Sequence, residues 1–182
     1  SWIDNWFLHD VETPSYRPMA IVFFHFIGSV FGENYVLARV FYFFLMIVLI
    51  MQINFLLLNL QFQKINIIIF SFFLIFAKIF STLLSWFTLG FLIFCYILAL
   101  ISIHFFLKWI NNKKPQYLFF SFFFAFLAIF TREELYILPG VIFILLLIKQ
   151  KSLFGNLTKN LFVFLLFSLI VLTHIFLRQN FV

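Results

Sequence analysis

Long apolar runs with very few charges limit the possible folds of this chain more than any motif does. Only 18 of its 182 residues are charged, 12 Lys or Arg against 6 Asp or Glu, and 65% are hydrophobic. Soluble domains carry about 25% charged and about 45–50% apolar residues, so a water-soluble domain is excluded. Disorder is excluded as well, because disordered chains are poor in apolar residues. The composition therefore predicts an integral membrane protein.

Two further features limit what kind of protein this can be. The single cysteine, Cys95, excludes a disulfide framework and a cysteine-based zinc site. The chain begins with Ser1-Trp2 and stops just after an apolar run at Val182, so we expect a segment of a longer protein. We treat residues 1–182 as one transmembrane domain fragment.

The order of polar and apolar segments predicts an all-α, polytopic bundle of about six transmembrane helices. Residues 1–17 are polar and predict an outer loop. Residues 18–32 begin with Pro18 and close with Gly32, and they are too short to span, because a span needs about 20 residues. They predict a membrane-parallel juxtamembrane helix. The transmembrane helices are expected within 35–178, at 35–60, 65–82, 84–109, 116–131, 134–149 and 160–178, with the turn near 81–85 marked least clearly.

The charges separate by face when the helices alternate in direction. One face receives seven lysines and no acid, and the other receives all six acids, all four arginines and Lys78. Lys and Arg are enriched in cytoplasmic loops, so the lysine-rich loops are predicted cytoplasmic and the acidic loops extracytoplasmic. The membrane is expected to be a bacterial or archaeal plasma membrane or an endomembrane. The seven lysines are Lys64, Lys108, Lys113, Lys114, Lys149, Lys151 and Lys159.

The first candidate site is the outer segment from His9 to Pro18. Asp10 and Glu12 lie in a loop that leads directly into the predicted juxtamembrane helix. A carboxylate held there can act as a general base on an acceptor hydroxyl, and Arg17 can bind a phosphate or pair with an acid. The alternative is an ordinary polar loop that caps a helix.

The second candidate site is the outer segment from Thr131 to Pro139. Arg132, Glu133 and Glu134 are three consecutive charges between two apolar runs. Arg132 is predicted at the membrane surface, at the level of a lipid phosphate. The alternative is a capped helical hairpin, in which Thr131 and Glu134 form a capping box.

Arg39 lies one turn into the first long helix, where it either reaches the headgroups or pairs inward with an acid. No metal-binding motif, glycine-rich phosphate loop or nucleophile elbow is found, so no metal and no cofactor is predicted. The net charge of +6 is interpreted as an indication of which loops face the cytoplasm. Nucleic acid is not expected as a partner.

Taken together and in this order, the outer segments resemble those of the C-type (GT-C) membrane glycosyltransferases. In that family an acidic first outer loop precedes a juxtamembrane helix, often entered through Arg-Pro, and a later outer Lys/Arg-Glu motif leads into an apolar helix containing Pro. The resemblance covers most of the chain, as an N-terminal fragment of a mannosyltransferase-like enzyme. The matching pieces are Asp10, Tyr16-Arg17-Pro18-Met19, Phe31-Gly32, Arg132-Glu133 and Leu138-Pro139.

The resemblance implies transfer of a sugar from a polyprenyl- or dolichyl-phosphate donor at the extracytoplasmic face. Asp10 would be the catalytic base, with Glu12 and Asp4 as substitutes. Arg132, with Glu133, would lie near the lipid phosphate. The chain departs from many relatives in the stretch 80–88, which has no charge, so that Lys78 is the nearest candidate there.

Three other functions stay open at this point. A transporter-like bundle would require ionisable residues deep within the helices, and the centres of the predicted spans contain almost none. A subunit of an organelle-encoded respiratory complex would require stable partner subunits and no donor lipid. A polysaccharide polymerase or ligase would share the chemistry with a different loop pattern.

Overall fold

The computed structural model describes residues 17–32, 34–76, 90–149 and 157–181. Within these ranges the chain forms helices and no strand, which confirms the predicted all-α class. The α-helices are α2 (Pro18–Phe31), α3 (Tyr35–Asn59), α4 (Lys64–Phe76), α6 (Gly90–Asn112), α7 (Pro115–Thr131), α8 (Leu138–Lys149) and α9 (Leu157–Phe181), and a 3₁₀ helix, η3 (Glu133–Ile137), joins α7 to α8.

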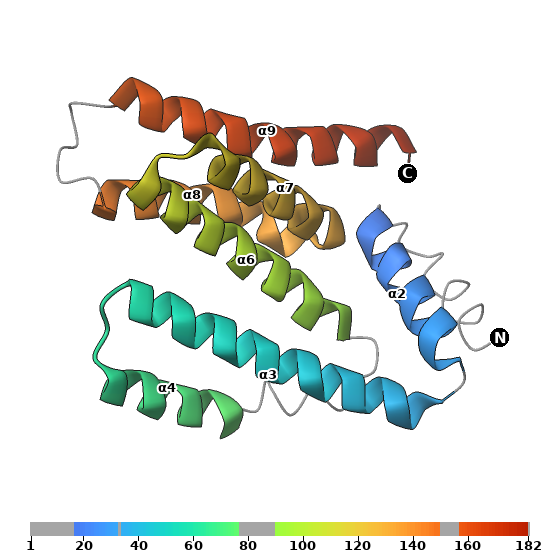
Figure 1. Ribbon diagram of the computed structural model, residues 1–182. Coiled ribbons are helices and arrows are strands. Elements are labelled where there is room, and N and C mark those ends of the chain that lie inside the picture. The colour runs from blue at the N-terminus through green and yellow to red at the C-terminus, as the bar shows by residue number, and fades with distance from the viewer. Residues whose placement is uncertain (1–16, 33, 77–89, 150–156, 182) are drawn as a thin grey trace.

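Helix α6 is the centre of the bundle. It packs against α3 on one side and against α7 and α8 on the other, while α4 lies outside α3 and α9 lies outside α7 and α8 (Figure 1). α2 contacts α7, α3 and α6 and runs at a steep angle to the long helices. The N-terminal ends of α2, α3 and α6 and the C-terminal end of α9 therefore lie toward the same end of the bundle (Figure 1).

The turn between α2 and α3 follows from three residues. Pro18 suits the first turn of α2, where its missing N–H costs no hydrogen bond. Gly32 ends the helix with φ of 54°, a left-handed conformation that glycine adopts readily, and its N–H donates to the Gly28 carbonyl at 2.9 Å. The side chain of Asn34 then caps α3 by accepting from the Leu37 N–H at 3.1 Å.

The turn between α6 and α7 is equally short. Lys113 adopts φ of 56°, and its N–H donates to the Trp109 carbonyl at 2.7 Å, which closes α6. Lys114 is extended, as the residue before a proline is expected to be, and Pro115 begins α7. The predicted breaks before 35, near 59–66 and at 111–115 are confirmed.

Close packing brings α6 against α3 and α7. A Cβ placed on Gly90 would overlap the ring of Tyr42, so only glycine allows this approach of α6 to α3. Farther along α6, the hydroxyl of Ser102 donates to the Ser121 carbonyl of α7 at 2.8 Å, so its polar group is satisfied inside the apolar bundle.

Large apolar side chains cover the outside of the bundle as well as its interior. On α2, Ala20, Phe23 and Ile27 are buried, whereas Val22 and Phe26 are exposed on the other side. A soluble monomer rarely exposes apolar patches of this extent. The exposed residues are compatible with contact to lipid, and on the other helices they include Phe43, Phe44, Ile47, Phe72, Phe73, Phe119, Phe123, Ile144, Ile148, Leu165, Leu169 and Phe176.

Three helices of the described part are long and apolar enough to cross a membrane, fewer than the six or so predicted. They are α3, α6 and the Asn160–Asn180 portion of α9. The predicted spans 65–82, 116–131 and 134–149 correspond to α4, α7 and α8, which have 13, 17 and 12 residues. At 1.5 Å per residue, even 17 residues reach only about 25 Å, less than the hydrocarbon core of about 30 Å. The remainder of 65–82 and the beginning of 84–109 lie outside the described residues.

Candidate functional site

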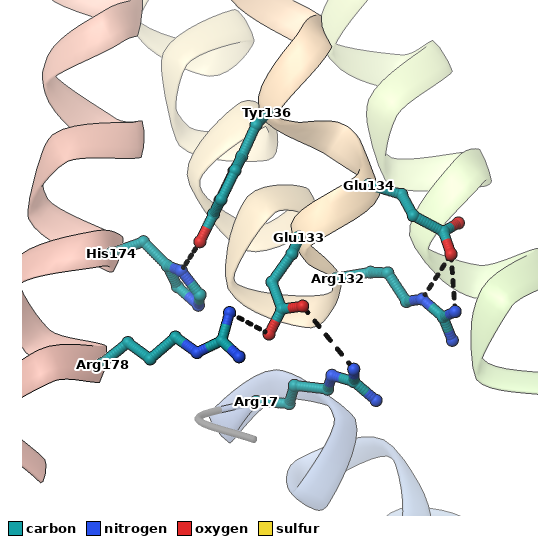
Figure 2. A network of polar contacts seen from close by, with 7 residues as sticks. All are labelled: Arg17, Arg132, Glu133, Glu134, Tyr136, His174 and Arg178. Atoms are coloured by element: carbon teal, nitrogen blue, oxygen red, sulfur yellow. Dashed lines mark hydrogen bonds and ion pairs between the residues drawn. The ribbon is translucent and has the colours of Figure 1, made fainter. Parts of the chain in front are cut away.

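An ion-pair cluster joins three distant parts of the chain at one end of the bundle. Glu133 begins η3, and its carboxylate lies 3.7 Å from the guanidinium of Arg17 and 3.1 Å from that of Arg178. Arg17 immediately precedes α2, and Arg178 belongs to the last turn of α9. Figure 2 shows the Glu133 side chain directed between these two arginines. The cluster thus links the entry of α2, the α7–α8 connection and the end of α9.

A second, tighter pair faces α6. Arg132 donates to Glu134 through both Nε, at 3.1 Å, and Nη2, at 2.6 Å. Tyr96 of α6 also donates to the Glu134 carboxylate, at 3.2 Å. The Arg132 guanidinium lies 5.5 Å from the centroid of the Phe91 ring, so it is held by an aromatic face as well as by an acid.

A buried hydrogen bond supports the cluster from α9. The hydroxyl of Tyr136 lies 2.6 Å from Nδ1 of His174, which is fully buried. Burial raises the pKa of Tyr136, and the nearby carboxylate of Glu133 raises it further, whereas Arg178 lowers it. The raised pKa keeps the phenol protonated at neutral pH, and its hydroxyl and Nδ1 of His174 share one hydrogen bond whose donor is set by the histidine tautomer. This bond joins η3 to α9 one turn before Arg178.

The connection between α7 and η3 places these charges. Thr131 is the last residue of α7, and its hydroxyl donates to the Leu127 carbonyl at 2.7 Å. The predicted capping box of Thr131 and Glu134 is therefore wrong: the threonine bonds back into the preceding helix, and the Glu134 carboxylate is occupied by Arg132 and Tyr96. Arg132 is extended between the two helices. Glu133 and Glu134 are consecutive residues of η3 and are directed to different sides, Glu133 toward Arg178 of α9 and Glu134 toward Tyr96 of α6 (Figure 2).

Electrostatics distinguish the two halves of the cluster. Three arginines and two glutamates leave one positive charge in excess. Arg132 and Glu134 are hydrogen-bonded to each other, but the Arg17 contact with Glu133 is too long for a hydrogen bond. Nε of Arg17 is buried and has no hydrogen-bond partner among the described residues. The Glu133 half therefore keeps guanidinium donors that can bind an anion such as a phosphate.

The structure brings some of the predicted site residues together and places another apart. Arg17, Arg132 and Glu133, which the sequence singled out in separate segments, lie together. Arg39 lies on an exposed face of α3 with its guanidinium 5.9 Å from the Tyr35 ring centroid, and no ion pair joins it to a described acid. Four further candidates lie outside the described residues: Asp4, Asp10, Glu12 and Lys78.

Three residues that contact the cluster, Arg178, His174 and Tyr96, were not predicted as part of the site, and Tyr136 lay within the predicted segment without an assigned role. Arg178 had already been assigned to the outer face, and His174 precedes it by four residues, a spacing that puts both on one side of a helix. This spacing could have indicated that His174 and Arg178 belong to one site. Tyr136 follows Glu133 by three residues, whereas nothing in the sequence connects Tyr96 to Glu134.

The lysines whose side chains are described lie toward the other end of the bundle. They occupy the last turns of α6 and α8, the α6–α7 turn and the start of α4. The ammonium of Lys149 lies 3.4 Å from the Asn59 carbonyl and so joins the ends of α8 and α3. The described acids and lysines are therefore separated along the helices; these lysines are Lys64, Lys108, Lys113, Lys114 and Lys149.

Among the described residues, no group of three or more His, Cys, Asp or Glu side chains is arranged to hold a metal ion. Comparison of the chain with protein-family models, with curated proteins and with solved structures finds no match.

Proposed function

We propose that this chain is part of a membrane glycosyltransferase that moves a sugar from a polyprenyl-phosphate donor to an acceptor at the extracytoplasmic face. The three helices long and apolar enough to cross a membrane are compatible with an integral membrane protein. The resemblance to GT-C enzymes supplies the reaction, and the ion-pair cluster supplies a candidate site for the donor phosphate.

The contact between Arg17 and Glu133 carries this proposal. The sequence singled out these residues independently, one at the end of the first outer loop and one in the later Arg-Glu motif. They lie 3.7 Å apart across α2 and η3. Asp10 and Glu12 precede Arg17 by seven and five residues in the sequence, so the proposed base and the proposed phosphate site are connected by a few residues of chain.

The chemistry required at such a site is stabilisation of a leaving group. In direct displacement, the acceptor oxygen bonds to the anomeric carbon while the bond from that carbon to the phosphate oxygen breaks, and the lipid phosphate leaves with added negative charge. Preorganised cations near that oxygen lower the barrier. We assign this role first to Arg17, whose Nε has no hydrogen-bond partner among the described residues, with Glu133 as a positioning residue that orients Arg17 and Arg178. Arg132 remains the second candidate, because its Nε and Nη2 already donate to Glu134. Asp10 would accept the proton of the acceptor hydroxyl.

The finer membrane arrangement is also a proposal. We infer that α4, α7 and α8 are embedded beside the three long helices, because they too expose large apolar side chains such as Phe73, Phe123 and Ile144. The steep angle of α2 to the long helices favours a membrane-parallel position for it (Figure 1). The ion-pair cluster would then face the extracytoplasmic side and the lysines the cytoplasm, as the positive-inside rule predicts.

Cysteine labelling tests this orientation. In a Cys95→Ala background, Glu134→Cys should react with a membrane-impermeant maleimide added outside intact cells or to the lumenal side of vesicles. Lys114→Cys should react only after permeabilisation. Lys114 is chosen over Lys113 because its backbone is extended, whereas Lys113 has a positive φ that disfavours cysteine. The reverse labelling pattern would contradict the assignment of both faces.

Donor binding tests the phosphate site. In membranes containing the whole encoded protein, a photoactivatable polyprenyl phosphate should label Arg17→Gln at least tenfold less than the parent, because a hydrogen bond to a charged group contributes about 1.5–3 kcal/mol. Arg17→Lys should recover part of the labelling, since lysine keeps the charge but loses the two-pronged geometry. Lys114→Gln, a charge loss at the opposite end, serves as the control. Labelling is normalised to folded protein, and parent-level labelling of Arg17→Gln would show that Arg17 does not hold the phosphate.

A second candidate function is a non-enzymatic membrane bundle in which the cluster is a structural clamp. The observation that favours it is that both carboxylates are already engaged by arginines. A transporter-like bundle or a respiratory-complex subunit would fit this reading. It predicts that loss of the cluster lowers stability without any effect on donor labelling per folded molecule.

A further inference from the structure

A groove separates α3 from α6 in the half of the bundle away from the ion-pair cluster. The two helices are in tight contact at Gly90 and Tyr42, and they diverge toward their C-terminal ends (Figure 1). The groove there has a volume of about 630 Å³. Its walls are mainly apolar, and several wall residues face outward; the lining residues are Val48, Met51, Gln52, Asn54, Phe55, Leu58, Ile101, His104, Phe105 and Lys108.

The length of the groove along α3 matches the thickness of one leaflet of a bilayer. From Val48 to Leu58 the helix rises about 15 Å, which is half of a hydrocarbon core of about 30 Å. Met51, Phe55 and Leu58 are among the exposed apolar residues, so the groove opens sideways toward lipid. These dimensions suit a hydrocarbon chain that enters from the side and lies along α3.

The end of the groove is positively charged. Among the described residues that line it, Lys108 alone carries a charge, and its side chain is exposed. Lys149, which contacts the Asn59 carbonyl, lies next to the end of α3. Both described acids, Glu133 and Glu134, belong to the cluster at the other end of the bundle, so neither neutralises these lysines. We call this end of the groove, with Lys108 and the neighbouring Lys149, the rim. Its positive charge is complementary to an anionic headgroup.

His104 adds a polar group within the apolar wall. Its Nε2 lies 3.2 Å from the Gln52 carbonyl, and the ring packs edge-on against Phe55. The residue is only 9% exposed, and its Nδ1 has no hydrogen-bond partner among the described residues. Because the Gln52 carbonyl can only accept, Nε2 carries the proton and Nδ1 is an acceptor. A buried ring nitrogen without a partner is unfavourable, and a hydroxyl group of a bound lipid could donate to it.

We propose that this groove binds an anionic glycerophospholipid of the lysine-side leaflet. Its phosphate headgroup pairs with Lys108 at the rim, and one acyl chain lies between Met51 and Phe105. The site is distinct from the donor-phosphate site, because Lys108 follows Tyr96 by 12 residues, about 18 Å along α6. The proposal therefore does not depend on glycosyltransferase activity.

Photo-crosslinking tests the site. Protein in phosphatidylcholine vesicles is labelled with a phosphatidylglycerol that carries a diazirine in its acyl chain, and crosslinks are mapped by mass spectrometry. We expect crosslinks within 48–58 and 101–108. Unlabelled phosphatidylglycerol should compete at about fivefold lower mole fraction than phosphatidylcholine, the effect of one lysine near an anionic lipid. Equal competition by the two lipids would overturn the proposal.

Matched variants make the test specific. Lys108→Gln should remove the preference for phosphatidylglycerol, whereas Lys64→Gln, another exposed lysine at the same end but outside the groove, should keep it. Ile101→Phe fills the groove and should abolish crosslinking to 48–58 in protein of unchanged helix content. Crosslinks that persist in Ile101→Phe, or equal effects of the two lysine variants, would contradict the site.

Two competitors distinguish the occupant. Soluble glycerol 1-phosphate should not displace the lipid, because the acyl chain supplies most of the contact area. Displacement by glycerol 1-phosphate would show that the rim binds free phosphate instead. A polyprenyl phosphate that competes better than phosphatidylglycerol would also refute the proposal, because it would identify the groove as a site for the isoprenoid chain.

Discussion

Asp10→Asn is expected to lower the rate of sugar transfer from a polyprenyl-phosphate donor at least a hundredfold, while membrane insertion stays intact. A positioned general base contributes about 10²–10⁴-fold to such a reaction. Asparagine keeps the size of the side chain but cannot accept the proton of the acceptor hydroxyl. Transfer is measured in membranes containing the whole encoded protein, with polyprenyl-phosphate mannose and polyprenyl-phosphate glucose as donors.

The neighbouring acids decide how this result is interpreted. Glu12→Gln and Asp4→Asn should reduce transfer less than Asp10→Asn does, and donor crosslinking should be unchanged in all three because the lipid phosphate is bound elsewhere. Full transfer in Asp10→Asn would remove Asp10 from the catalytic role. A larger loss in Glu12→Gln would move that role to Glu12.

Local chemistry made much of the fold predictable. Pro18, Gly32, Asn34 and Pro115 each fix a helix end through backbone conformation or capping, which does not depend on distant residues. The breaks at these positions were therefore correct within a few residues. The number of spans was less accurate, because apolar runs such as 116–131 indicate contact with lipid or core but not the length of helix that results.

The candidate site was predictable only in part. The scarcity of charge directed attention to Arg17 and to Arg132 and Glu133, since few other ionisable groups exist in the chain. Their pairing geometry depends on how α2, η3 and α9 pack, which sequence spacing does not specify. Tyr96 illustrates this limit: its bond to Glu134 follows from the close packing of α6 beside the α7–α8 connection.

Glu133→Gln is expected to have the second large effect, on transfer and on the junction of α2 with α9. The carboxylate lies between Arg17 and Arg178, and both it and Arg17 are about three-quarters buried. An amide cannot balance two guanidinium groups, so the arginines repel each other and lose their fixed orientation. We expect transfer per folded molecule to fall at least tenfold, with a measurable loss of thermal stability.

A double-mutant cycle separates the two functions proposed for the cluster. Residues that interact directly show coupling energies of about 0.5–3 kcal/mol, so the stability effects of Glu133→Gln and Arg178→Gln should not add, whichever function is correct. Donor crosslinking per folded molecule is the discriminating readout. If Glu133 positions Arg17 for a phosphate, crosslinking falls in Glu133→Gln even at temperatures where the variant is fully folded. If the cluster is a clamp alone, crosslinking follows the folded fraction and the phosphate site must be sought elsewhere, whereas the coupling between Glu133 and Arg178 persists.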